Sequence, residues 1–188
     1  IYGQPERMPL VESMPRNPLS AYGMAKLQTE EMLEWVSKLT DFRYVALRYF
    51  NASGAHPSGE IGEDHSPETH LIPLVLQVAL GKRKEIKIFG TDYPTPDGTC
   101  VRDYIHVCDL ARGHIAAMDY LMGGGSSVAF NIGTGEGYSV RQVIEACRKE
   151  TGHPIPAVEN PRRPGDPPSL YADPSAIQKI LGWKPVES

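Results

Sequence analysis

The stretch RYVALRYFNASGA, residues 43–55, decides the fold class of this chain. Residues Tyr44–Phe50 form a nearly continuous run of apolar and aromatic side chains, which is typical of a parallel strand buried on both faces. Asn51 and several small residues then end the strand in a loop. Directly before it, Ser20 can cap a helix that runs to about Leu39. A helix followed by a buried strand indicates the crossover unit of a parallel sheet.

The rest of the chain continues this alternation. The sequence predicts further helices over 70–80 closed by Gly81, over 110–122 capped by Asp109, over 139–151 and over 174–181. It predicts further strands over 85–90, 100–107 and 128–133. Between the first two of these strands, Asp97-Gly98 favours a tight hairpin.

Strands alternating with helices predict an α/β protein. Some elements are typical of the edge of a doubly wound parallel sheet, and others, with hairpins and Pro-rich loops, are typical of a smaller α/β lobe. We assign residues 1–55 to the first domain, with 104–133 contributing, and residues 56–188 mainly to the second lobe. Two interleaved lobes suggest a cleft between them.

Composition excludes several classes of function. Of 188 residues, 40% are apolar and 22% are charged, as in ordinary globular proteins. The net charge of −4 argues against nucleic-acid binding, and no run of about 18 apolar residues suggests a membrane span. Cys100, Cys108 and Cys147 fit neither a disulfide framework nor a zinc pattern, so we expect a reducing, cytoplasmic location.

Tyr22 and Lys26 lie four residues apart on the first predicted helix and therefore share one face of it. An ordinary tyrosine has a pKa of about 10, so ionising it near pH 7 requires about 4 kcal/mol of preferential stabilisation. A neighbouring ammonium supplies part of that stabilisation, and a phenolate is a competent general base for a sugar hydroxyl. By spacing alone, a chance pairing on one helix face is the simpler explanation.

Three glycines in NIGTGEGYSV, residues 131–140, follow a predicted strand and precede a helix, which is the context of a dinucleotide-binding turn. Their spacing is G-x-G-x-G rather than G-x-G-x-x-G, and the next acidic candidate, Glu159, lies in a Pro-rich loop. We therefore interpret the stretch as a flexible turn in which Ser139 caps the next helix.

The candidates for anion binding are Arg102 and the pair Arg162-Arg163, because a guanidinium can donate two hydrogen bonds to one phosphate. Asp166 could accept hydrogen bonds from ribose hydroxyls, although Gly-Asp is also ordinary turn chemistry. The six histidines show no metal-ligand spacing, so we expect no metal site and interpret His106 as a packed or surface residue.

Taken together and in order, these fragments resemble the C-terminal part of the UDP-glucose 4-epimerases, a group within the extended short-chain dehydrogenase/reductase family. The matching fragments are SAYGMAK, LRYFNASGAHPSGEIGE, HLIPLVLQVALGKR, IFGTDYPTPDGTCVRDYIHVCDLARGH, NIGTGEGYSV, RRPGD and YADPS with LGW. The block DYPTPDGTCVRDYIHV is the most specific, because related nucleotide-sugar dehydratases and decarboxylases diverge there. The resemblance implies the C-terminal portion of a Rossmann-type NAD-binding domain and a lobe that binds a UDP-sugar.

The resemblance also implies roles for single residues. Tyr22 would be the catalytic base, and Lys26 would favour its ionised form and hold the nicotinamide ribose of NAD. Phe50 would lie by the nicotinamide and Asn51 by the sugar diphosphate. The other implied substrate contacts are His70 and Leu71 facing the nucleotide, Lys87, Ile88 and Phe89 around the uracil, Arg102 and Arg163 at the diphosphate, Asp166 at the uridine ribose and Leu170 at the hexose pocket.

The implied reaction interconverts UDP-galactose and UDP-glucose through a 4-keto intermediate, with tightly bound NAD and no net oxidation. The family's Gly-rich NAD fingerprint and catalytic serine would precede Ile1, and the opening residues IYG look like the end of a strand entering a turn. We therefore expect a truncated chain that is inactive alone, and a homodimer when full length.

Two alternatives stay open. The first is another nucleotide-sugar epimerase or dehydratase of the same family, such as a C4 epimerase for UDP-N-acetylhexosamine or UDP-pentose. The second is a non-catalytic fragment that binds a UDP-sugar without binding NAD.

Overall fold

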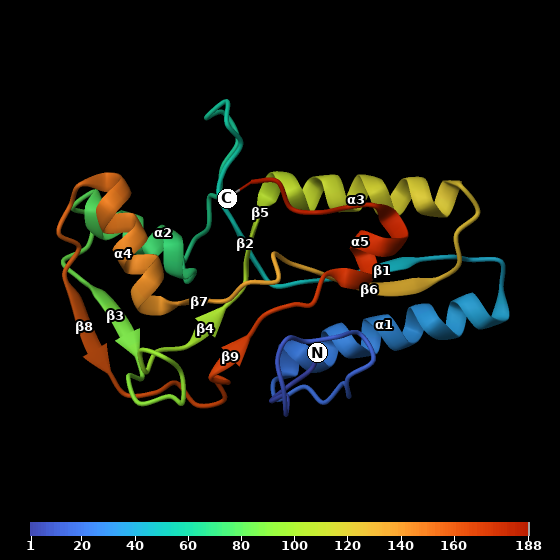
Figure 1. Ribbon diagram of the computed structural model, residues 1–188, viewed down its shortest axis with the longest axis horizontal. Helices are drawn as coiled ribbons and strands as arrows, with labels where there is room; N and C mark the ends of the chain where they lie inside the picture. The colour runs from blue at the N-terminus through green and yellow to red at the C-terminus, as the bar shows by residue number, and fades with distance from the viewer. Residues whose placement is uncertain (188) are drawn as a thin grey trace. The chain divides into compact units, whose positions relative to one another are not determined.

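Pairs of parallel strands flanked by helices carry the fold in a computed structural model that describes residues 1–187, which confirms the predicted α/β class (Figure 1). The chain divides into two units. The first comprises residues 1–54, 103–136 and the segment from Leu170 onward, and the second comprises residues 55–102 and 137–169.

The first unit is built on two neighbouring parallel strands. Strand β1 (Val45–Tyr49) pairs with β6 (Val128–Ile132), with Val45 opposite Val128, so both predicted strands are confirmed. A second parallel pair joins β2 (Asn51–Ser53) to β5 (Tyr104–His106). The helices of this unit are α1 (Ala21–Leu39), α3 (Val107–Met122) and α5 (Ser175–Leu181). Figure 1 shows α3 and α5 on one side of the β1–β6 pair and α1 on the other.

The core of the first unit lies where α3 and α5 cover the strands. Burial of these apolar side chains is the main favourable contribution to the stability of the unit. The buried residues are Ile105, Phe130, Ile132, Ile177 and Trp183. Residues 170–187, which the sequence analysis placed mainly with the second lobe, pack on β6 and α3 through α5.

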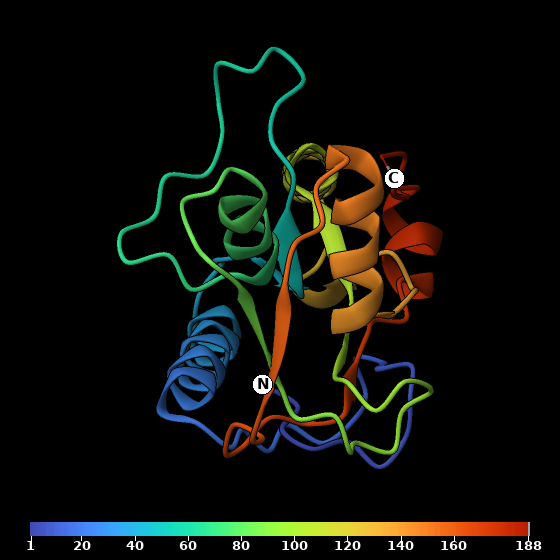
Figure 2. The ribbon, with the colours of Figure 1, turned by 90° about the vertical axis from the view of Figure 1, so that its left-hand side faces the viewer.

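The second unit has its own parallel pair and its own core. Strand β3 (Ile86–Phe89) pairs with β8 (Ala157–Asn160), and α2 (Leu71–Ala79) packs on both β3 and α4 (Val140–Thr151). The core residues are Val75, Val78, Ile86, Ile88, Ile144 and Ile155. The long loop that precedes α2 extends away from that helix (Figure 2).

Three short strands form a further small sheet. The sheet has the order β7 (Tyr138–Ser139), β4 (Val101–Arg102), β9 (Ser169–Leu170). The predicted hairpin between the strands at 85–90 and 100–107 is wrong, because β3 pairs with β8 and β4 pairs antiparallel with β7. The tight turn itself is present, since the Gly98 amide donates to the Thr95 carbonyl at 3.2 Å.

The predicted cap of the helix over 110–122 is also wrong. Helix α3 begins at Val107, and His106 is its N-cap, with its Nδ1 accepting from the Cys108 amide at 3.1 Å. Asp109 is instead fully buried in the first turn, where its carboxylate accepts from the amides of Val186 and Glu187 at 3.0 and 2.9 Å. A helix long and apolar enough to cross a membrane is not found among residues 1–187.

Candidate active site

Tyr22 and Lys26 lie in the first two turns of α1, as the spacing predicts. Ser20 caps the helix, and its hydroxyl accepts from the Gly23 amide at 3.0 Å, which confirms the predicted N-terminus. The Tyr22 side chain is 73% exposed, and the Lys26 Nζ lies 5.3 Å from the centroid of its ring. The helix therefore presents a phenol and an ammonium side by side to the solvent.

The buried residues of α1 anchor the helix that carries Tyr22 and Lys26. Gly23, Leu27 and Glu30 are the buried residues of the helix, and Tyr22 and Lys26 each precede one of them by a single position. A buried carboxylate is unusual and must be paired with a cation. Glu30 is only 4% exposed, and it is paired on two sides.

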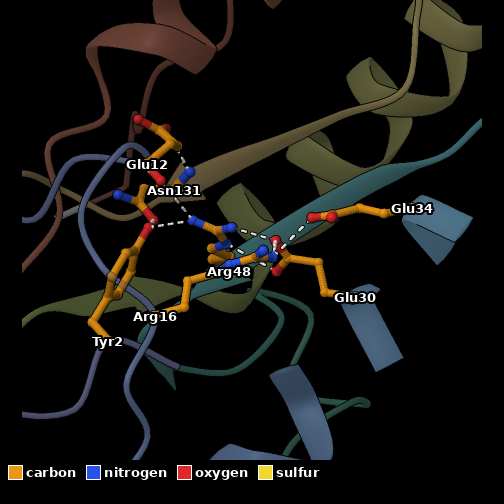
Figure 3. Close-up of polar contacts among 7 residues, drawn as sticks. All are labelled: Tyr2, Glu12, Arg16, Glu30, Glu34, Arg48 and Asn131. Atoms are coloured by element: carbon orange, nitrogen blue, oxygen red, sulfur yellow. Dashed lines mark hydrogen bonds and ion pairs between the residues drawn. The ribbon is translucent and has the colours of Figure 1, made fainter. Parts of the chain in front are cut away.

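A polar network around Glu30 ties α1 to β1 (Figure 3). The Arg48 guanidinium, on β1, forms a double hydrogen bond with the Glu30 carboxylate through Nε, at 3.0 Å, and Nη2. Arg16 donates to the same carboxylate at 3.0 Å and to Glu34 at 2.8 Å. Figure 3 shows both guanidinium groups meeting at Glu30.

The network continues to the N-terminal segment and to β6. Arg48 also donates to the Tyr2 hydroxyl at 2.7 Å, and that hydroxyl donates to the Asn131 Oδ1 at 2.6 Å. The Asn131 side chain in turn donates to the Leu10 carbonyl at 2.8 Å. This network is not apparent in the sequence, because a Glu and an Arg 18 residues apart on different elements leave no local pattern.

The charges within the network shift the pKa of Glu30. Burial alone would raise the pKa of this carboxyl above 4.5, but the hydrogen bonds from Arg48 and the charges of Arg48 and Arg16 lower it below that value. Glu30 therefore stays ionised in the folded protein at neutral pH.

Phe50 and Asn51 follow the end of β1, where the carboxyl ends of parallel strands commonly form binding sites. Asn51 opens β2, its amide donates to the Asp103 carbonyl at 3.1 Å and its side chain donates to the same oxygen at 2.9 Å. Phe50 is half-buried. These two residues and the Tyr22–Lys26 pair belong to the first unit.

In the second unit, the structure brings Arg102 and Asp166 together. The Arg102 Nη2 lies 3.7 Å from the Asp166 Oδ1, and the Arg102 side chain is 16% exposed. Arg102 also donates from Nη1 to the Val101 carbonyl at 2.8 Å, which orients the guanidinium. Asp166 closes a turn after Gly165, since its amide donates to the Arg163 carbonyl at 3.4 Å. The turn and the ion pair together place both predicted ligand groups at one spot.

Arg162 and Arg163 each stack on an aromatic ring. The guanidinium of Arg163 lies 3.9 Å from the centroid of Phe89, and that of Arg162 lies 4.2 Å from the centroid of Tyr93. Arg162 is also paired with Asp92 at 2.7 Å. Among residues 1–187, Arg163 has no carboxylate partner, so its positive charge is available to an anion.

Two further predicted site residues, Lys87 and Ile88, lie on opposite faces of strand β3. Its side chains alternate, so that Ile88 is 3% exposed within the core while Lys87 is exposed to solvent. His70 and Leu71 begin α2: His70 is its N-cap residue without a side-chain cap bond, and Leu71 packs against the core. Leu170 ends β9, is half-buried, and accepts from the Asp103 amide at 3.1 Å.

Asp103 is the residue that sequence reasoning missed most clearly. Its side chain is fully buried and accepts from the Thr134 amide at 2.9 Å, the Gly135 amide at 3.3 Å and the Ala172 amide at 3.1 Å. The glycine-rich turn therefore has its amides occupied by a carboxylate of its own chain. That occupancy supports its interpretation as a structural turn rather than as a phosphate cradle.

The cap that ends this glycine-rich stretch is confirmed. The Ser139 hydroxyl accepts from the Gln142 amide at 3.1 Å, and the Gln142 side chain accepts from the Ser139 amide at 2.8 Å, which is a complete capping box. The same hydroxyl donates to Asp97. Glu159, the acidic candidate of the fingerprint, is exposed on β8 and paired with Arg141 at 2.5 Å.

Known proteins similar to this chain are nucleotide-sugar enzymes. A curated UDP-glucose 4-epimerase of Halalkalibacterium halodurans is 56% identical over 98% of this chain and 55% of its own length. The crystal structure of UDP-glucose 4-epimerase from Brucella ovis in complex with NAD has a TM-score of 0.95 and 49% identity, covering 100% of this chain and 57% of that one. The structure of UDP-glucose 4-epimerase from Bifidobacterium longum in complex with NAD+ and UDP has a TM-score of 0.91 and 47% identity, covering 100% and 56%.

The chain spans about half the length of the curated relatives it matches. The family model described as GDP-mannose 4,6 dehydratase matches residues 1–188, the whole of the chain. The Tyr22–Lys26 pair on α1 and the parallel strands beside it are part of that match. The chain therefore belongs to the family described as GDP-mannose 4,6 dehydratase.

Proposed function

We propose that the whole protein is a UDP-glucose 4-epimerase, which interconverts UDP-galactose and UDP-glucose with NAD as its cofactor. The observation that carries this proposal is the exposed Tyr22–Lys26 pair on α1, in a chain 56% identical to a UDP-glucose 4-epimerase. On spacing alone the pair was a weak signal. Its place at the exposed first turns of a capped helix supports a role in chemistry.

Tyr22 would exchange a proton with the C4 hydroxyl of the hexose. Its phenol is exposed, so a substrate hydroxyl can reach it, and the Lys26 ammonium lies beside the same ring, 5.3 Å from its centroid. The Glu30–Arg48 pair holds the helix that carries both groups against β1. The chain thus supplies a fixed acid and base for the hydroxyl proton.

Tyr22, Lys26 and Phe50 would hold the nicotinamide end of NAD, which supplies a hydride acceptor and donor when bound. These residues fit such a group, because a phenol, an ammonium and a half-buried aromatic ring offer hydrogen bonds and an apolar surface. Among the residues that the structure describes, Lys26 has no carboxylate partner, so its ammonium is available to ribose hydroxyls.

Arg102, Arg163 and Asp166 of the second unit would bind the nucleotide part of the UDP-sugar. Arg102 and Arg163 would pair with the diphosphate, and Asp166, beside Arg102, would accept hydrogen bonds from the ribose. The remaining proposed contacts are His70, Leu71, Lys87, Ile88, Phe89, Asn51 and Leu170. Because Ile88 has a buried side chain, it would contribute through its backbone. Binding energy gathered at the nucleotide orients a hexose that must turn over during the reaction.

A homodimer and a cytoplasmic location complete the proposal. Three side chains on α1 support the dimer: Met32, Trp35 and Leu39 are between 63% and 77% exposed, and such an apolar surface is typical of an interface. The cysteines Cys100, Cys108 and Cys147 are all free thiols, which supports a reducing compartment. Sedimentation of the full-length protein, with a Trp35→Glu variant as comparison, tests the dimer.

The activity is tested with three substrates on the full-length protein: UDP-galactose, UDP-N-acetylgalactosamine and UDP-arabinose. We expect UDP-galactose to be converted to UDP-glucose with the highest kcat/KM. Absence of UDP-galactose turnover contradicts the proposal. A higher kcat/KM for UDP-N-acetylgalactosamine or UDP-arabinose would instead identify the protein as the C4 epimerase of that sugar. Calorimetry of the 188-residue chain with UDP then shows whether this chain alone binds the nucleotide.

A further inference from the structure

Four potential metal ligands meet in the loop that precedes α2. They are Glu63, His65, Glu68 and His70, and one ligand atom from each lies within 4.8 Å of all the others. The loop extends away from α2 (Figure 2). The spacing in the sequence does not indicate this group, because His65 and His70 are five positions apart in a segment without secondary structure.

The contacts within the group converge on the imidazole nitrogens. The His70 Nδ1 lies 2.8 Å from the Glu63 Oε1 and 2.9 Å from the Glu68 Oε1, and the His65 Nδ1 lies 3.4 Å from the same Glu63 oxygen. The two imidazole rings are 5.0 Å apart between centroids. A ring nitrogen carries at most one proton, so it cannot satisfy two carboxylates fully. Two carboxylates and two imidazole rings thus lie within reach of one shared ion.

The excess of acidic residues in this loop also favours binding of a cation. Residues 52–70 contain four acidic residues and neither Lys nor Arg. Glu68 is fixed in position, because its Oε1 accepts from the amides of Thr69 and His70 at 2.7 Å each and its side chain is 10% exposed. These two backbone hydrogen bonds hold the carboxylate beside His70.

We propose that Glu63, His65, Glu68 and His70 form a binding site for one divalent transition-metal ion of the zinc class. In a tetrahedral zinc site the ligand bonds measure about 2.0–2.2 Å, so the ligand atoms are roughly 3.5 Å apart. The most widely separated ligand atoms, which lie up to 4.8 Å apart, would approach by about 1.3 Å to reach that geometry, and the atoms of the closest pairs, at 2.8 and 2.9 Å, would move apart slightly. Two imidazoles with two carboxylates favour zinc, cobalt or nickel over magnesium and calcium, which prefer oxygen ligands alone.

Calorimetry of the untagged 188-residue chain with ZnCl2 tests the site, with MgCl2 and CaCl2 titrated in parallel. We expect one zinc ion per chain and no comparable binding of magnesium or calcium. His70→Ala and Glu63→Gln should each weaken zinc binding at least about tenfold, since even residues that only orient a ligand contribute that much. The matched controls are His56→Ala and Glu60→Gln, exposed residues of the same loop outside the group, which should leave zinc affinity unchanged.

Cobalt reports the coordination directly. With CoCl2 we expect the intense visible absorption of four-coordinate cobalt, and we expect His65→Ala to abolish it. Far-UV circular dichroism of every variant shows whether it is folded, and Glu63→Gln provides a second test if a histidine variant is not. The proposal is overturned if zinc does not bind stoichiometrically, or if binding survives His65→Ala and His70→Ala. Because metal binding is measured directly, this outcome is independent of any epimerase activity.

Discussion

Glycine is required at position 133 because the Asp103 side chain approaches it closely. A Cβ at this position would clash with the Oδ2 of Asp103 and would meet the Ala172 Cβ at 2.9 Å. The glycine therefore lets the buried Asp103 carboxylate approach the turn closely and accept the amides of Thr134 and Gly135. Gly133 is thus explained by packing, and Gly135 by a turn conformation with a φ of 84°, rather than by a dinucleotide.

Gly133→Ala should destabilise the fold, because the added methyl group has no space beside Asp103. We expect a loss of about 1–3 kcal/mol in the free energy of unfolding, measured by urea titration. Gly62→Ala is the control, since its Cβ would meet only the Ala55 Cβ at 3.8 Å. Its stability should stay within about 0.5 kcal/mol of the wild type. Equal stability of the two variants would contradict the role given to Asp103.

Arg102→Ala tests the proposed diphosphate site at the same scale. Hydrogen bonds to charged groups contribute about 1.5–3 kcal/mol, so we expect KM for UDP-galactose to rise roughly 10- to 150-fold in the full-length protein. The value of kcat should change less, because the diphosphate is remote from C4. Arg83→Ala, at an exposed arginine of the same unit, should change neither. An unchanged KM in Arg102→Ala would exclude this residue from the site.

At the scale of elements, the attachment of α1 to β1 depends on one buried ion pair. Glu30 has a pKa below 4.5 in the folded chain, since the hydrogen bonds and charge of Arg48 and the charge of Arg16 outweigh the effect of burial. The folded state therefore binds this proton less readily than the unfolded state. The stability that Glu30 contributes is complete above pH 4.5 and is lost as the pH falls through the lower folded pKa.

Glu30→Gln should lose about 3–5 kcal/mol of stability at pH 7, because Arg48 is left buried without its counter-charge. Below pH 4.5 the wild type should approach the variant, so that the difference between them shrinks on acidification. Urea titrations from pH 7 downward measure both effects. Glu31→Gln, an exposed neighbour on α1, should follow the wild type throughout. A difference that stays constant with pH would contradict the assignment.

Sequence patterns predicted the regular elements well and the long-range polar contacts poorly. The helix over 20–39, the strands at 44–50 and 128–133 and the Ser139 cap depend on local periodicity and capping, and the structure confirms them. The start of α3 was misplaced because a buried Asp109 looks like a cap in sequence. The prediction of a hairpin was wrong because the strands on either side of the turn, β3 and β4, pair with β8 and β7 instead of with each other.

Across the chain, the combination of motifs, rather than any one of them, indicates the protein family. The Tyr-x-x-x-Lys spacing alone did not distinguish catalysis from chance, whereas its order with the blocks around Arg102 and Arg163 indicated a nucleotide-sugar enzyme. The site residues came from the resemblance, and their contacts came from the structure. The contacts of Glu30 with Arg48 and of Asp103 with Thr134 join residues that are distant in the sequence, so no local pattern indicates them. The group of Glu63, His65, Glu68 and His70 lies in an irregular loop, which has no periodic pattern either.

Tyr22 is proposed to exchange the C4 proton of a UDP-hexose in the full-length protein. The most direct measurement compares the kcat for conversion of UDP-galactose to UDP-glucose in the wild type, Tyr22→Phe and the control Tyr44→Phe. A positioned general acid or base contributes about 10²- to 10⁴-fold, so Tyr22→Phe should lower kcat by that factor while Tyr44→Phe retains activity. Conversion at an unchanged rate in Tyr22→Phe, or no conversion by the wild type, would contradict the account.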